Sequence, residues 1–173
     1  MSLIETTATT LTLPSGSVID VPTCHLYFAP WKGEPSLAPI YNRNPKPVVN
    51  LHGTPMFAEL VVLRLLETFG WSGVWLDSYR RRALVTWGDP PMSVELPAAQ
   101  AQVLDRVPEK WGTWDIFAWR DSNVLFADVK RKHKDRSTSA QKRWLEAALA
   151  AGFQPTQFAL MEWTYRPSRA TSR

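Results

Sequence analysis

Residues 114–130 read WDIFAWRDSNVLFADVK, which is two apolar runs separated by a short polar cluster. The cluster Arg120-Asp121-Ser122-Asn123 consists of residues that favour turns. Two β-prone runs joined by such a cluster predict a β-hairpin. Both faces of the runs are mostly apolar, so we expect this hairpin in the middle of a sheet that is covered on both sides.

Two aspartates and a lysine share one face of the predicted hairpin. With the turn at 120–123, alternation of side chains places Asp115, Asp128 and Lys130 together. The register gives the pairs Trp119–Val124, Phe117–Phe126 and Asp115–Asp128. Opposed residues have Cβ atoms roughly 4.5–5.5 Å apart, and two carboxylates that close repel each other. A divalent cation would relieve this repulsion, as would the Lys130 ammonium alone, whereas a one-residue shift would separate the aspartates.

The composition is that of a globular chain with one core. A length of 173 residues is enough for one domain, and 45% apolar residues exclude an intrinsically disordered chain. No apolar run approaches the ~20 residues of a transmembrane helix, and the N-terminus lacks a signal-peptide pattern, so no membrane partner is expected. The one cysteine, Cys24, excludes an internal disulfide framework and favours a reducing, cytoplasmic setting.

Positive charge is concentrated in the part of the chain that holds the hairpin. From Arg120 onward there are 11 Lys/Arg and 5 Asp/Glu, whereas the first 119 residues hold 9 and 11. This asymmetry favours a polyanionic partner, with solubilising charge on an exposed face as the alternative. The basic residues nearest the hairpin are Arg131, Lys132, Lys134 and Arg136 in a loop, and Lys142 and Arg143 on a following helix.

We divide the chain into three parts. Residues 1–50 contain many prolines and are expected to form an irregular N-terminal extension packed on the core, in which 6–12 is either a strand or a loose arm. Residues 51–166 form the main domain, and 167–173 a frayed basic tail.

Two strong helices flank the hairpin in sequence. The first is expected to begin at Thr54-Pro55, where Thr54 suits the N-cap, and to end at Gly70. It carries Glu59 on an apolar face, where a carboxylate needs a partner. The second runs from Thr138 or Ser139 to Ala151, and its Gln141 either completes a capping box or points into the site.

Shorter elements complete the pattern. We expect strands at 73–77 and 158–163 and a short helix at 97–107 beside the site. The triplet Arg80-Arg81-Arg82 either contacts phosphate or is a solvated turn. The order is therefore helix with Glu59, strand, strand with Asp115, strand with Asp128 and Lys130, helix with Gln141, strand.

In this order of motifs, the chain resembles the PD-(D/E)XK nuclease superfamily, and within it the VRR-NUC, Holliday-resolvase-like group. The matching pieces are Glu59, Trp114-Asp115, Asp128-Val129-Lys130 and Ser139-Ala140-Gln141-Lys142-Arg143-Trp144-Leu145. The likeness covers about residues 53–165. Trp114 stands where the family has proline, and residues 1–50 have no counterpart.

The resemblance implies an α/β fold with a restriction-endonuclease-like αβββαβ core, in which helices flank a mixed central sheet. Residues 1–50 would be an extra N-terminal segment added to this core. It implies that Asp115, Asp128 and the backbone carbonyl of Val129 bind Mg²⁺ or Mn²⁺, with Glu59 supporting the metal. Lys130 would orient and help to deprotonate a water, and Gln141 would position Lys130 or the phosphate. The reaction would be hydrolysis of a phosphodiester in DNA. The resemblance alone also raises a homodimer.

Two other functions stay open at this point. One is a catalytically inactive nucleic-acid-binding module of the same fold, because fold does not fix function. The other is a structural or partner-binding protein whose tryptophans form an interface.

Overall fold

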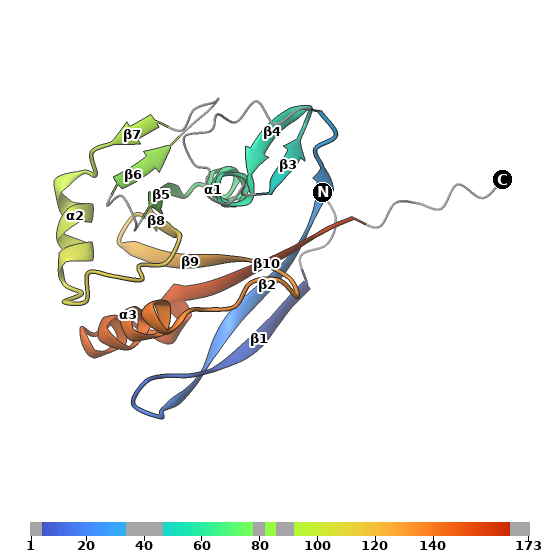
Figure 1. The fold of residues 1–173 in the computed structure, drawn as a ribbon. Coiled ribbons are helices and arrows are strands. Elements are labelled where there is room, and N and C mark those ends of the chain that lie inside the picture. Colours follow the sequence, from blue (N-terminus) through green and yellow to red (C-terminus); the bar gives the residue numbers. More distant parts are fainter. Residues whose placement is uncertain (1–4, 34–46, 78–81, 86–91, 167–173) are drawn as a thin grey trace.

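A mixed sheet of ten strands organises the protein. The computed structural model describes residues 5–33, 47–77, 82–85 and 92–166. The strands are β1 (Glu5–Thr12), β2 (Val18–Pro30), β3 (Val48–Leu51), β4 (Thr54–Phe57), β5 (Ser72–Asp77), β6 (Arg82–Val85), β7 (Met92–Val94), β8 (Ile116–Arg120), β9 (Asn123–Arg131) and β10 (Phe158–Tyr165). The α-helices are α1 (Ala58–Thr68), α2 (Ala98–Asp105) and α3 (Ser139–Ala150). The fold is therefore mixed α/β (Figure 1).

The order across the sheet is β4-β3-β2-β10-β9-β8-β5-β6-β7, and β1 pairs with β2. The chain runs antiparallel between β5, β8 and β9, and then α3 carries it to β10, which lies parallel to β9. The β8–β9 hairpin thus occupies the middle of the sheet, as its apolar faces predict.

The register predicted for the hairpin is confirmed within β8 and β9. Trp119 pairs with Val124 and Phe117 with Phe126. The turn itself is tighter than the predicted cluster, because Arg120 and Asn123 already belong to the strands. Asp121 takes the left-handed conformation, with φ 54°, which aspartate tolerates better than most residues.

Helices cover the two faces of the central strands, and each face has its own apolar core. Helix α1 packs on the face that carries Ile116, Ala127 and Val129, and α3 packs on the opposite face (Figure 1). On the α3 side the Phe126 ring lies 5.2 Å from the Phe117 ring and 5.0 Å from the Trp144 ring, measured between centroids. These cores fix the strand that carries Asp128 and Lys130.

The predicted start of the first helix is wrong. Thr54-Pro55 belongs to β4, which pairs with β3 across a turn at His52-Gly53, and α1 begins only at Ala58. Pro55 suits this place because β4 is an edge strand, where a missing N–H need not break the ladder. The predicted end is correct, since Phe69 caps the helix and Gly70 takes φ 78°. Glu59 consequently lies in the first turn of α1.

The expectation of an irregular segment at 1–50 is also wrong for its described part. β1 and β2 are long strands of the main sheet, and β2 lies directly beside β10. Pro22 is tolerated because it precedes Thr23, where the pairing with β10 begins, and Pro30 ends the strand. Buried Leu11 and Val21 pack this segment on the core.

The remaining elements appear close to their predicted positions: β5, α2, α3 and β10. Arg82 begins β6, whereas Arg80, Arg81 and the basic tail lie outside the described residues. Among the described helices, none has the length and apolar character needed to cross a bilayer.

Candidate active site

Asp128 lies at the centre of a buried polar network on the α3 side of the sheet. Its side chain is fully buried, and its Oδ1 accepts hydrogen bonds from Lys130 Nζ at 2.6 Å and from Gln141 Nε2 at 2.8 Å. Its Oδ2 accepts from the Ser137 hydroxyl at 3.2 Å. A buried carboxylate needs such partners, because an isolated buried charge is costly.

Gln141 joins this network to the start of α3. Its Oε1 accepts from the Thr138 N–H at 3.0 Å and from Lys130 Nζ at 3.2 Å, while its Nε2 donates to Asp128. The Thr138 hydroxyl accepts from the Gln141 N–H in return, which completes the capping box. The two roles that the sequence sets against each other are therefore performed by one side chain.

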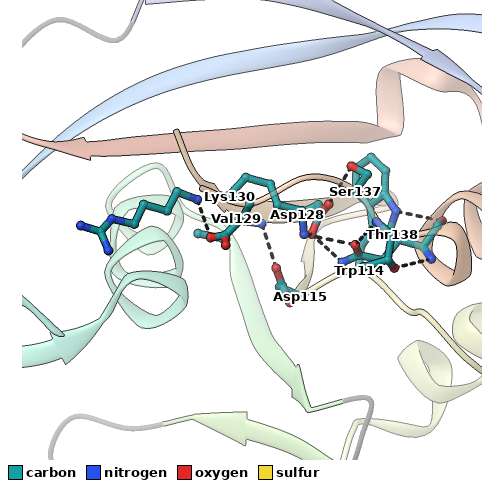
Figure 2. A network of polar contacts seen from close by, with 10 residues as sticks. Trp114, Asp115, Asp128, Val129, Lys130, Ser137 and Thr138 are labelled. Carbon is teal, nitrogen blue, oxygen red and sulfur yellow. Dashed lines mark hydrogen bonds and ion pairs between the residues drawn. The ribbon is translucent and has the colours of Figure 1, made fainter. Parts of the chain in front are cut away.

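Asp115 takes a different position from the one that a regular hairpin predicts. It precedes β8, and its Oδ2 accepts from the Val129 N–H at 2.9 Å. Its own carbonyl accepts from the Leu76 N–H of β5 at 2.6 Å. Figure 2 shows Asp115 directed at Val129, whereas Asp128 is turned toward Ser137. The Asp115 carboxylate thus contacts the backbone of β9 at the residue after Asp128. The two carboxylates are directed at different partners.

A cavity of about 510 Å³ opens beside this network. Val129 and Trp163 line this cavity, together with a set of residues that have charged or hydroxyl side chains: Glu59, Asp115, Lys130, Lys134, Asp135, Arg136 and Thr138. Glu59 reaches the cavity from the first turn of α1 with 9% of its surface exposed. Asp128 and Gln141 are absent from the lining and lie behind Lys130, which they hold.

Two of the six predicted phosphate-binding residues line the cavity, namely Lys134 and Arg136. The Arg131 guanidinium instead lies over the rings of Trp163 and Tyr165, 5.5 and 5.1 Å from their centroids. The backbone N–H of Arg131 donates to Asp135 Oδ2 at 2.9 Å, which closes the basic loop. Arg131 therefore shapes the loop.

The other three predicted basic residues lie away from the cavity lining. The Lys132 N–H donates to the Trp163 carbonyl at 2.8 Å, which anchors the loop to β10. Lys142 is half-buried on α3, and exposed Arg143 lies 3.9 Å from Glu109. The structure does not bring Lys142 and Arg143 to the cavity.

The residues that line the cavity suit a hard divalent cation in part. Mg²⁺ in proteins is usually held by one or two carboxylates and completed by water and substrate phosphate. Glu59, Asp115 and Val129 line one cavity, which therefore has two residues with carboxylate side chains in its wall. Among the described residues, no group of three His, Cys, Asp or Glu side chains converges to hold a metal.

Ser137 is the functional candidate that the sequence did not reveal. It precedes the N-cap Thr138, and only the three-dimensional path of the loop brings its hydroxyl to Asp128. Trp114 also contributes, since its Nε1 donates to the Gln141 carbonyl at 3.4 Å. The run of serine and threonine at 137–139 predicted a helix cap but not a second contact to the aspartate.

Comparison of the chain with protein-family models, with curated proteins and with solved structures finds no match.

Proposed function

We propose that the protein is a Mg²⁺- or Mn²⁺-dependent deoxyribonuclease of the cytoplasm that hydrolyses phosphodiester bonds. One observation carries this proposal. Lys130 is held by Asp128 and Gln141 at the wall of a cavity that Glu59 and Asp115 also line. Two carboxylates can hold a divalent metal ion, and an ammonium fixed beside them, together with basic side chains, can stabilise the negative charge of a phosphodiester during hydrolysis.

The fold proposed for this activity is the restriction-endonuclease-like core of the PD-(D/E)XK superfamily, with the VRR-NUC group as the nearest likeness. The order α1, β5, β8, β9, α3, β10 supports it, because it follows the αβββαβ order once β6, β7 and α2 are taken as an insertion between β5 and β8. Glu59 lies in α1, Asp128 and Lys130 in β9 and Gln141 in α3, as expected, whereas Asp115 lies just before β8.

The metal would be held by Glu59, Asp115 and the Val129 carbonyl, with Asp128 as the remaining carboxylate of the proposed set. When bound, the ion would lower the pKa of a water molecule and neutralise charge on the phosphate. Asp128 is already the counter-ion of Lys130. Any contact of Asp128 with a cation would therefore weaken its hold on the lysine ammonium and leave Lys130 more available to the substrate.

Lys130 would orient the attacking water and stabilise the charge that develops on the phosphate. Gln141 keeps the Lys130 ammonium in place by accepting from it, and the helix cap keeps Gln141 in place. Lys134 and Arg136 line the same cavity and would bind the phosphates on either side of the bond that is cut.

The deciding experiment is cleavage of labelled single-stranded, duplex and branched DNA with Mg²⁺ or Mn²⁺, comparing the native protein with Asp128→Asn and Lys130→Met. Asparagine keeps the size of Asp128 and removes its charge. The control is Asp121→Asn, which removes an exposed carboxylate from the hairpin turn. We expect metal-dependent cutting by the native protein and the control only. Cutting that survives both site variants, or that needs no metal, would contradict the proposal.

A second function is favoured by one specific observation. Both oxygens of Asp128 already have partners, and its carboxylate does not line the cavity. This arrangement also suits a metal-free module that only binds nucleic acid. Such a module would show no cutting and no Mg²⁺ binding by calorimetry, but its DNA affinity would fall steeply with salt.

The tryptophans offer little support for the structural or partner-binding alternative. Trp75, Trp114, Trp144 and Trp163 are all buried in the two cores, so they are not available to a partner in the folded protein. Among the tryptophans that the structure describes, Trp111 is the exposed one, with 52% of its surface accessible, and Trp31, Trp71 and Trp119 are partly buried.

A further inference from the structure

The outer edge of β1 presents a regular set of backbone hydrogen-bonding groups. The Leu13 N–H donates to the Ser17 carbonyl at 2.8 Å at the end of the β1–β2 ladder. In an antiparallel ladder, residues that bond across the pair alternate with residues that point away. The odd-numbered residues of β1 therefore bond to β2, and Thr6, Ala8, Thr10 and Thr12 direct their N–H and C=O groups outward.

Pro22 supports this assignment independently. It is the register partner of Ala8, and it has no N–H to donate. The Ala8–Pro22 pair therefore fits a position at which the two strands do not exchange hydrogen bonds. In the described part of the chain, β1 pairs with β2 alone.

This edge lacks the features that usually prevent one sheet from joining another. Proteins protect edge strands by shortness, proline, charge or a bulge. The other edges of the sheet have such protection, because β7 has three residues and β4 has four, one of them Pro55. By contrast, β1 has eight residues in unbroken register, and 6–12 contains neither charge nor proline.

β1 is also held firmly enough to serve as a template. The Thr10 hydroxyl donates to Asp20 at 2.7 Å, and the Thr23 hydroxyl donates to the Thr9 hydroxyl at 2.7 Å. Leu11 is buried in the core on the α3 side. The exposed edge therefore belongs to a strand that is bonded to β2 and packed on the core.

We propose that β1 pairs edge to edge and antiparallel with β1 of a second copy of this chain. The register follows from the outward-pointing residues. If Thr9 faces Thr9, then Ala8 faces Thr10 of the second copy and Thr6 faces Thr12, so every outward group meets an outward partner. Antiparallel pairing places the two Glu5 residues at opposite ends, whereas a parallel arrangement would oppose them. A two-fold axis makes this contact self-complementary and closed.

The resulting dimer is concentration-dependent, because an eight-residue strand pair buries less than the ~1,600 Å² of a standard stable interface. Analytical ultracentrifugation of the full chain over a range of concentrations measures it. The informative pair of variants is Thr10→Pro, which removes an outward donor from both copies, and Thr10→Val, which keeps the N–H and the β-branched shape. Both variants lose the hydrogen bond to Asp20, so their difference reports the backbone donor. We expect a roughly 30-fold rise in the dissociation constant for proline, and little change for valine.

A crosslinking experiment tests the register without relying on the proline variant folding. In a Cys24→Ser background, Thr9→Cys places two thiols opposite each other across the axis, within the Cα distance of roughly 4.4–6.8 Å that a disulfide requires. Thr7→Cys is the control, since its symmetry partner lies opposite residue 11. Oxidation should give a covalent dimer for Thr9→Cys only.

Three results would overturn the proposal. One is a protein that stays monomeric up to about 1 mM, the weak end of specific association. Another is a Thr10→Pro dimer as strong as the native one, with an unchanged circular dichroism spectrum. The third is crosslinking of Thr7→Cys as readily as Thr9→Cys. In the first of these cases, binding of an extended peptide of unrelated sequence along β1 would assign the edge to another protein.

Discussion

At the scale of single residues, the site depends on one buried ion pair and on the amide that orients it. Asp128 is fully buried, and the Lys130 side chain is 12% exposed. Removing one member of such a pair leaves the other uncompensated, which costs far more than the pair contributes. Replacing Asp128 by alanine is therefore expected to lower the stability of the protein as well as to alter the site.

Asp128→Ala should destabilise the protein by about 3–5 kcal/mol, because the Lys130 ammonium loses its buried counter-charge. Replacing both residues, with Asp128→Ala and Lys130→Met, should restore much of that loss. Urea unfolding of the two variants and of the native protein measures the difference. Equal stability of the single and the double variant would show that the ion pair is not the cause.

Gln141→Glu tests the donor role of the amide. Glutamate keeps the capping box but places a second carboxylate where Nε2 donates to Asp128 at 2.8 Å. We expect a loss of about 1–3 kcal/mol at neutral pH. Thr138→Ala removes a cap bond only, so its cost should be about 1 kcal/mol. Chemical unfolding measures both variants, and a Gln141→Glu variant as stable as the native protein would contradict the donor role of the amide.

The sequence predicted most of this set of residues but not its geometry. Alternation along the hairpin brought Asp128 and Lys130 to one face, and the structure confirms their contact. The position of Asp115 was not predictable from the hairpin alone, because its carbonyl bonds to Leu76 of β5. The contact of Ser137 with Asp128 depends equally on a loop path that no periodicity encodes.

At the scale of elements, the N-terminus of α3 is held against the loop that leads into β8. Gly112 takes φ 78°, and a Cβ there would collide with the carbonyl group of Ala140 and the nitrogen of Gln141. The missing side chain thus allows the loop to approach the helix closely. This contact places Gln141 relative to β9.

Gly112→Ala should therefore cost several kcal/mol and displace Gln141. Gly16→Ala is the matched control, since Gly16 also has a positive φ, 88°, but no atom lies near its would-be Cβ. The control should cost only the ~1–2 kcal/mol of the backbone conformation. Thermal unfolding of the two variants measures the steric part as their difference. Similar losses in both would contradict the close approach.

The starts of α1 and α3 differ in how well local sequence preferences predict them. Thr54-Pro55 is a good helix start, yet the same pair is acceptable in an edge strand, and pairing with β3 decides the outcome. The boundaries of α3 were predictable, because Thr138 and Gln141 form a cap by local contacts alone. Local signals thus fixed α3, whereas a tertiary pairing moved the start of α1.

At the scale of the whole molecule, one aromatic residue links elements from distant parts of the chain. The ring of Phe126 in β9 stacks on the ring of Phe158 in β10, with 5.3 Å between the centroids. It also meets the Trp144 ring of α3 edge-on, with 5.0 Å between the centroids. We expect Phe126→Ala to lower the free energy of unfolding by about 3–5 kcal/mol. Val18→Ala, at a position 61% exposed, should change it little. Denaturant unfolding compares them, and equal effects would contradict this account of the core.

The position of β2 was the part of the fold least accessible from the sequence. Its partner β10 lies at the other end of the chain, with Thr23 paired to Leu160. No local pattern specifies a parallel pairing over that separation, and the prolines around it favoured an irregular segment. Only the completed sheet shows that β2 is an internal strand.

The same pairing of β2 with β10 has a consequence for synthesis on the ribosome. A chain emerging N-terminus first exposes β2 on the order of ten seconds before its partner strand is made. During that interval the edge that β10 later covers stays available to other nascent chains and to chaperones. The sheet cannot close until β10 has left the exit tunnel, so β2 lacks its parallel partner until then.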